Sequence, residues 1–141
     1  AAILSDVDEA MIQSAGAFGH DLGMAFQIID DVLDFTGEQA TVGKPVASDL
    51  RQGLITLPAI YYLEAHPQDE EIKAVLNGGR SDEERILRLL ESIRASGAVR
   101  QSLEEAHRFL YRGLDALDDL PDGLERGALR KLGSYIVDRD I

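Results

Sequence analysis

The sequence predicts an all-α fold, a helical bundle of about six helices joined by short connections. Apolar residues recur at helical spacing along nearly the whole chain, and no segment alternates convincingly as a strand does. The 141 residues are 45% hydrophobic and 28% charged, which supplies enough apolar material for a packed core. At this length we expect a single all-helical domain over residues 1–141.

The longest expected helix lies at the start of the chain. Ser5 or Asp6 can cap it, and its apolar pattern continues to about Phe35, where Thr36 and Gly37 open a loop. The other helices are expected from Leu57 or Pro58 to Ala65, over about Asp69–Leu76, from the capping box Ser81-Asp82-Glu83-Glu84, from after Gly97 to Pro121, and from about Gly123. Two of them carry apolar stripes, namely Ile86, Leu89, Leu90 and Ile93, and Val99, Leu103, Ala106, Leu110, Leu114 and Leu117.

Composition and charge exclude several functions. The 26 acidic against 14 basic side chains give a formal charge of −12, which argues against nucleic acid as a partner. Without cysteine there is no disulfide framework and no thiol nucleophile. The longest apolar stretch, near Gly53–Leu63, is shorter than the ~20 residues of a transmembrane segment. No signal peptide is visible, so we expect a cytoplasmic protein; the missing initial Met also fits a piece of a longer protein.

Small residues form a stripe on the first expected helix. Ala15, Gly19 and Gly23 repeat every four residues, with Gly16 beside them. Each glycine inside a helix costs about 0.5–1 kcal/mol relative to alanine. We interpret the stripe as a place where another helix approaches closely, and a ligand lying against the bare backbone is the alternative.

Three carboxylates interrupt an otherwise apolar segment near the end of this helix. Asp30 and Asp34 lie one turn apart on one face, with Asp31 three residues before Asp34 and Gln27 one turn earlier. Like charges at this spacing destabilise a helix, so a cation is expected to offset them. Mg²⁺ fits, because it is held by one or two carboxylates, waters and the oxygens of a substrate phosphate. The alternative is a solvated acidic stripe on a surface helix.

An ordered series of short motifs follows the aspartates. Gly43-Lys44-Pro45 comes first, then Asp49-Leu50-Arg51-Gln52-Gly53, then Thr56-Leu57-Pro58. A lysine in a Gly/Pro loop can complement an anion bound at a metal–carboxylate cluster, as a point charge on a flexible stem. Considered by itself, Lys44 is better interpreted as an ordinary exposed loop lysine.

The run from Gly23 to Gly37 resembles the second aspartate-rich region of trans-isoprenyl diphosphate synthases, the polyprenyl synthetase family, and the later motifs follow in that family's order. The resemblance implies a partial isoprenoid-synthase fold and a homodimer or other oligomer. It also implies Mg²⁺-dependent prenyl transfer, in which an allylic diphosphate is ionised and condensed with isopentenyl diphosphate.

Residue roles are implied by position within the family's motifs. Asp30 would be the principal magnesium ligand, with Asp31 and Asp34 binding through water or orienting the ligands, and with Asp49 supporting the hydrated metal or the lysine. Gln27 would face the diphosphate or the carbocation, and Lys44 would neutralise the leaving group. The cavity wall would include Phe26, Leu22 and Ile29.

Two departures limit what the chain is expected to do alone. Leu54 follows Gly53 where many family members have lysine, which removes one diphosphate contact. No second DDxxD-like cluster is present, since Asp115–Asp119 reads as a helix end. We therefore expect the C-terminal half of a polyprenyl synthetase, catalytically inert in isolation. The alternatives are a non-catalytic partner subunit of a heteromeric prenyl diphosphate synthase and a plain helical bundle with an acidic surface.

Overall fold

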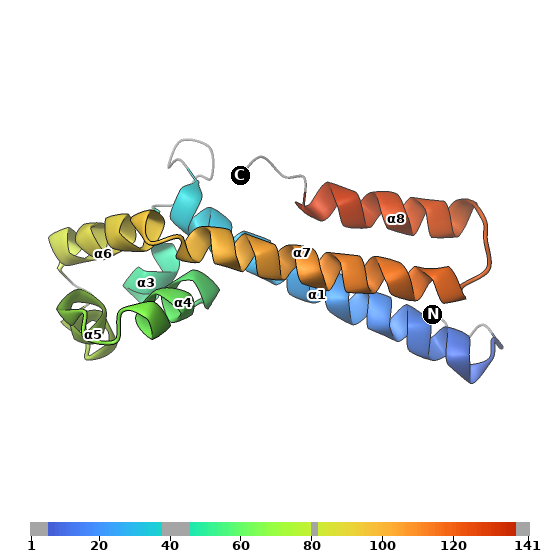
Figure 1. Cartoon of the computed structure of the whole chain (residues 1–141), viewed down its shortest axis with the longest axis horizontal. Helices are drawn as coiled ribbons and strands as arrows, with labels where there is room; N and C mark the ends of the chain where they lie inside the picture. Colours follow the sequence, from blue (N-terminus) through green and yellow to red (C-terminus); the bar gives the residue numbers. More distant parts are fainter. Residues whose placement is uncertain (1–5, 38–45, 80–81, 138–141) are drawn as a thin grey trace. The chain divides into compact units, whose positions relative to one another are not determined.

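The computed structural model describes residues 6–37, 46–79 and 82–137, and the regular structure in these ranges is entirely helical (Figure 1). This confirms the all-α class. The α-helices are α1 (Glu9–Thr36), α3 (Ser48–Gln52), α4 (Leu57–Ala65), α5 (Glu70–Leu76), α6 (Glu83–Ala95), α7 (Ala98–Ala116) and α8 (Leu124–Val137), with one 3₁₀ turn at Leu117–Asp119. Within the described ranges, no helix combines the length and the apolar character that crossing a membrane requires.

The chain divides into two compact units. The first takes the described residues up to Ile29 and from Glu104 onward, and the second is Asp30–Leu103. Helices α1 and α7 therefore each contribute to both units. The expectation of a single domain over residues 1–141 stays a prediction.

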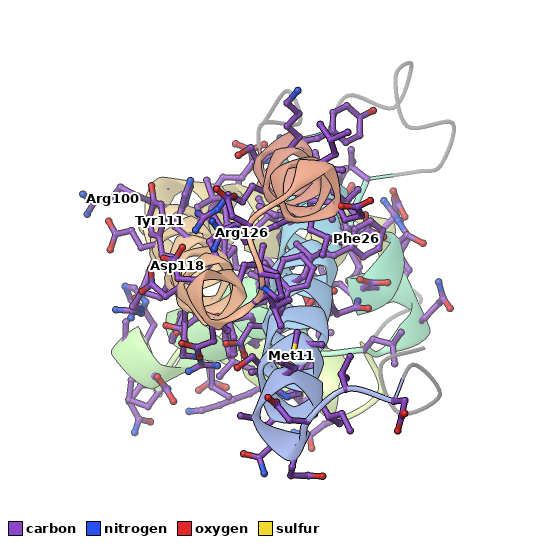
Figure 2. All side chains as sticks on the ribbon, turned by 90° about the vertical axis from the view of Figure 1, so that its right-hand side faces the viewer. Met11, Phe26, Arg100, Tyr111, Asp118 and Arg126 are labelled. Atoms are coloured by element: carbon purple, nitrogen blue, oxygen red, sulfur yellow. The ribbon has the colours of Figure 1, made fainter. Side chains whose placement is uncertain are left out.

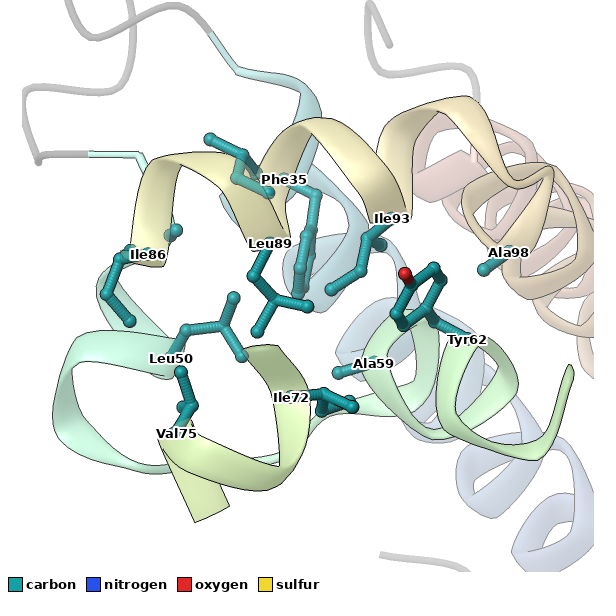
Figure 3. Close-up of a cluster of buried hydrophobic side chains, with 12 residues drawn as sticks. Phe35, Leu50, Ala59, Tyr62, Ile72, Val75, Ile86, Leu89, Ile93 and Ala98 are labelled. Atoms are coloured by element: carbon teal, nitrogen blue, oxygen red, sulfur yellow. The ribbon is translucent and has the colours of Figure 1, made fainter. Parts of the chain in front are cut away.

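The second unit has a well-defined apolar core (Figure 3). The stripe predicted on α6 is buried in it, and α4 and α5 pack against α6. The core members are Phe35, Ala47, Leu50, Ala59, Tyr62, Ile72, Val75, Ile86, Leu89, Leu90, Ile93 and Ala98. Arg94 of α6 also donates from Nε to the carbonyl of Phe35 at 2.6 Å, which ties α6 to the last turn of α1. The end of α1 is thus fixed by packing and by a hydrogen bond.

Asp69 joins α4 to α5 in this unit. Its carboxylate accepts from the Glu71 and Ile72 amides at 2.8 and 3.2 Å, capping α5, and from the Tyr62 hydroxyl at 2.6 Å. Burial acts to raise the pKa of Asp69, but the hydrogen bonds from Tyr62, Ile72 and Glu71 outweigh it and lower that pKa. Burial and the Asp69 carboxylate together raise the pKa of the Tyr62 phenol.

The first unit packs α1, the later part of α7 and α8 together through two glycines. A Cβ at Gly113 would lie 3.2 Å from the Asp21 Cβ, and a Cβ at Gly133 would lie 3.1 Å from Leu110. At the turn between α7 and α8, Arg126 donates to the Leu120 carbonyl at 3.0 Å and to that of Asp118 at 3.4 Å, and Figure 2 shows Asp118 and Arg126 side by side. The close approaches at Gly113 and Gly133 set the spacing of the three helices.

Some local expectations were wrong in detail. Helix α1 begins at Glu9, and Asp8 caps it by accepting from the Met11 amide at 2.8 Å. Asp6 instead has a left-handed backbone with φ 54°, and Ser5 lies outside the described residues. Asp82, rather than Ser81, is the N-cap of α6 and accepts from the Arg85 amide at 3.1 Å. In both places an aspartate one to three residues downstream takes the capping role.

The small-residue stripe of α1 faces open space in the part of the chain that the structure describes. A Cβ added to Gly16, Gly19 or Gly23 would meet nothing within 4 Å. The close helix packing that we expected at this stripe is made instead at Gly113 and Gly133, which the sequence analysis did not single out.

Candidate functional site

The acidic motif occupies the last two turns of α1. Val32 and Phe35 on the same turns are fully buried, whereas Asp30 is exposed and Asp31 and Asp34 are half-buried. The helix is unbroken through Thr36, so the one-turn spacing of Asp30 and Asp34 is present as expected. The apolar residues therefore anchor this segment, while the carboxylates lie toward its outer side.

Asp34 connects α1 to α3, a helix that the sequence analysis did not expect. Its Oδ1 accepts from the Ser48 amide and its Oδ2 from the Asp49 amide, each at 3.0 Å. Its carbonyl accepts from the Ala47 amide at 2.9 Å. The carboxylate thus serves as the N-terminal cap of α3, although it lies 14 residues before that helix.

Both backbone groups of Asp49, its amide and its carbonyl, make hydrogen bonds. Its amide donates to Asp34, and its carbonyl accepts from the Leu54 amide at 2.8 Å. The Gly53 amide donates to the Leu50 carbonyl at 3.0 Å with a left-handed φ of 79°, which completes a Schellman motif at the end of α3. Leu50 is fully buried in the core, so α3 is fixed at both ends and along one face.

The remaining candidate residues differ in their position along the chain and in their exposure. Gln27 and Phe26 belong to the turn of α1 before Asp30, in the first unit, and Phe26 is 37% exposed. Ile29 is fully buried, and Leu22 is partly buried near Gly133. Lys44, with Gly43 and Pro45, lies outside the described residues.

The oxygen donors fit a hydrated magnesium ion that shares its shell with a phosphate. Within residues 6–37, 46–79 and 82–137, no group of three or more histidine or acidic side chains could hold a metal ion by itself. Mg²⁺ does not need such a cage, because one or two carboxylates, waters and phosphate oxygens complete its octahedron. Asp30 and Asp31 provide carboxylate oxygens of this kind, and both oxygens of Asp34 already accept backbone amides.

The structure therefore defines an all-helical chain with an acidic motif in the last turns of α1. The family model for polyprenyl synthetase matches residues 1–93, so the chain belongs to the polyprenyl synthetase family. This confirms the resemblance seen in the sequence. The family consists of trans-prenyltransferases and is generally Mg²⁺-dependent.

Similar curated proteins are longer than this chain. It is 39% identical to heptaprenyl diphosphate synthase component 2 of Geobacillus stearothermophilus, over 99% of the chain and 43% of that protein. It is 34% identical to the protein of the same name from Bacillus subtilis, over 98% of the chain and 39% of that protein. The chain thus spans less than half the length of these relatives and corresponds to their C-terminal half.

Solved structures agree on the fold. Heptaprenyl diphosphate synthase from Staphylococcus aureus matches with a TM-score of 0.89 and 32% identity, over 99% of this chain and 43% of that one. A polyprenyl synthase from Caulobacter crescentus, complexed with calcium and isoprenyl diphosphate, matches with a TM-score of 0.87 and 31% identity over the same shares. The partial isoprenoid-synthase fold is therefore confirmed.

Sequence signals for α3 were present. Ser48 and Asp49 are good helix-starting residues, and Gly53 is a typical helix-ending residue, but the segment between them has only five residues. What no local pattern could indicate is that the capping carboxylate comes from Asp34 in another helix.

Proposed function

We propose that this chain provides the second aspartate-rich wall of a Mg²⁺-dependent prenyl diphosphate synthase site. Asp30 is the principal metal ligand and Asp31 assists it. Magnesium held by these carboxylates would stabilise the negative charge that develops on the departing diphosphate of an allylic substrate. One observation carries the proposal: the ordered motifs beginning at Asp30-Asp31 lie in a chain that the polyprenyl synthetase model matches over residues 1–93.

The neighbouring residues take supporting roles in this proposal. Gln27 orients the diphosphate or faces the developing cation, and Lys44 neutralises the leaving group. Phe26 contributes to the apolar wall, which its 37% exposure supports. Asp49 supports the hydrated metal, and its backbone, fixed at both ends, suits that role.

We propose further that the chain is catalytically inert alone and needs the polypeptide corresponding to the rest of its longer relatives. A single carboxylate wall cannot hold the metal cluster that ionises the substrate. The exposed face of α1 supports this, because three glycines there meet no neighbour in the described structure and Met24 is 38% exposed beside them. Such a face is suited to covering by further helices.

The assay mixes the chain with Mg²⁺, an allylic diphosphate and isopentenyl diphosphate, alone and co-expressed with the part of the G. stearothermophilus relative that the chain does not cover. We expect product only from the pair, and loss of product with Asp30→Asn in this chain. Asp115→Asn, an exposed aspartate of α7, is the matched control and should leave product unchanged. Turnover by the chain alone, or full activity of the Asp30→Asn pair, would contradict the proposal.

A second candidate is a non-catalytic partner subunit of a heteromeric synthase. The name "component 2" of two relatives favours considering it. In that case the chain would bind a complete synthase in a pull-down and change its activity even with Asp30→Asn, whereas the proposed catalytic role requires that aspartate.

A further inference from the structure

Asp34 of α1 accepts hydrogen bonds from three consecutive backbone amides. The Ser48 and Asp49 amides each donate to one of its carboxylate oxygens at 3.0 Å, and the Ala47 amide donates to its carbonyl at 2.9 Å. The arrangement links the acidic motif directly to the segment that carries Asp49.

Helix α3 depends on this external acceptor. It has only five residues, and a helix so short does not persist without outside partners. Its N-cap residue, Ala47, provides no side-chain hydrogen bond and adopts a left-handed backbone with φ 56°, which is unfavourable for a residue with a Cβ. The first amides of α3 therefore need a partner from elsewhere, and a carboxylate at a helix N-terminus is the favourable choice.

We propose that Asp34 is a positioning residue: its carboxylate holds the start of α3 at the end of α1 and so fixes the backbone of Asp49 relative to the acidic motif. This deepens the proposed function and rests on it where Asp49 is concerned. Each Asp34 carboxylate oxygen already accepts one backbone amide, so a cation bound to this carboxylate would compete with the hydrogen bonds that cap the start of α3.

The first test needs no metal. Amide hydrogen exchange at Ser48 and Asp49 is measured in the metal-free chain, for the wild type, Asp34→Asn and Asp34→Ala. With Asp34→Ala we expect exchange at both positions to accelerate by roughly 5–30-fold, the factor that loss of an N-cap acceptor represents. Asparagine is a good N-cap but has one acceptor oxygen, so Asp34→Asn should give a smaller acceleration. Asp30→Ala is the control and should leave both amides unchanged.

Exchange at the amides of Leu89 and Leu90, which lie in the buried stripe of α6, distinguishes loss of the cap from destabilisation of the whole unit. If Asp34→Ala accelerates these as much as Ser48 and Asp49, the comparison passes to Asp34→Asn, which keeps the side-chain size. Unchanged exchange at Ser48 and Asp49 in both variants would overturn the proposal, whatever the chain binds.

The second test adds Mg²⁺ and inorganic pyrophosphate to the wild type co-expressed with the polypeptide used in the activity assay. A positioning role predicts that exchange at Ser48 and Asp49 stays the same or slows, whereas a ligand role predicts acceleration because the cation competes with these amides for the carboxylate. By calorimetry, Asp34→Asn should keep pyrophosphate affinity within about threefold and Asp34→Ala should lose about tenfold or more, because asparagine replaces the cap but not a charged ligand. Equal losses for both variants would overturn the positioning role. Absence of any wild-type binding would contradict the proposed function. The capping role of Asp34 would then be tested by the metal-free amide exchange alone.

Discussion

Removing Arg112 should destabilise the first unit through Asp21. The Asp21 side chain is 6% exposed and accepts from Arg112 Nε at 2.5 Å and Nη2 at 2.6 Å, while His20 Nδ1 lies 2.9 Å from Oδ1. The Arg112 guanidinium also lies 4.7 Å from the centre of the Phe109 ring. Arg112→Met keeps much of the apolar stem and removes both charged hydrogen bonds. The Asp21 carboxylate would then stay buried beside the exposed His20, without its two hydrogen bonds from Arg112.

The size of the effect follows from the burial of the two partners. Breaking a fully buried ion pair costs about 3–5 kcal/mol, and a surface pair contributes about 0–1 kcal/mol. Because the Arg112 side chain is 63% exposed, water can reach the vacated position and partly hydrate Asp21. We therefore expect Arg112→Met to lower the free energy of unfolding by about 2 kcal/mol, or to lower Tm by roughly 6–10 °C.

Urea unfolding followed by far-UV circular dichroism measures this change, and Arg108→Met is the matched control. Arg108 lies one turn earlier on α7 and pairs with Glu105 at the surface, where its side chain is 65% exposed, so its loss should cost less than about 0.5 kcal/mol. In a double-mutant cycle, Asp21→Asn and Arg112→Met should show a coupling of about 1–2 kcal/mol. Equal effects of the two arginine variants, or an additive cycle, would refute the reasoning.

The same pair gives stability a defined pH dependence. The hydrogen bond from Arg112 lowers the pKa of Asp21; burial opposes this, and His20 adds to the lowering. A carboxyl group with a lower pKa in the folded state stabilises the fold above its unfolded pKa of about 3.9, and this contribution is lost as the pH falls through the folded value. The wild type should therefore lose more stability than Arg112→Met between about pH 5 and pH 2. Parallel curves for the two proteins would contradict the assignment.

Three further predictions concern glycines and the departure at Leu54. Gly19→Ala should raise the free energy of unfolding of this chain by about 0.5–1 kcal/mol, because the added Cβ meets no other atom within 4 Å. Gly113→Ala should lower it by about 1–3 kcal/mol, because the added Cβ would lie 3.2 Å from the Asp21 Cβ. Urea denaturation that gives both variants the same sign would contradict this. Gly53→Ala should cost about 1–2 kcal/mol at φ 79°, checked by thermal unfolding, and a neutral result would exclude the left-handed helix end. Leu54→Lys, at a side chain 53% exposed, should leave stability within about 0.5 kcal/mol and strengthen Mg²⁺–pyrophosphate binding several-fold by calorimetry; unchanged affinity would place residue 54 away from the anion.

The helical fold could be predicted from the sequence because its strongest signals are periodic. The stripe from Ile86 to Ile93 is wholly buried, and α4 has the bounds expected for it, Leu57–Ala65. Helix starts were less certain because several capping residues compete within a few positions, as Asp8 and Asp82 show. The two-unit organisation could not be inferred, since α1 and α7 continue through the boundary without a break in their patterns.

The spacing of the acidic motif could be predicted from the sequence, but the hydrogen bonds between Asp34 and the start of α3 could not. Asp30 and Asp34 have equivalent positions on the helix surface, so periodicity alone gives them the same role. The difference arises from a contact across 14 residues of sequence, when α3 places its first amides on Asp34. The spacing of Gly16, Gly19 and Gly23 likewise indicates room for a neighbour but does not identify it, and no described segment of this chain lies within 4 Å of an added Cβ there.

Charge compensation explains why the proposed site depends on a metal rather than on nearby side chains. The formal charge of −12 disfavours the approach of a free diphosphate. Arg51, the cationic residue nearest in sequence to Asp49, is already engaged: its Nε donates to the Val46 carbonyl at 3.1 Å and its Nη1 pairs with Glu83. Leu54 supplies no charge where many family members have lysine. In the proposed site the divalent cation, together with Lys44, supplies positive charge to the diphosphate, so the affinity for pyrophosphate should follow the magnesium concentration.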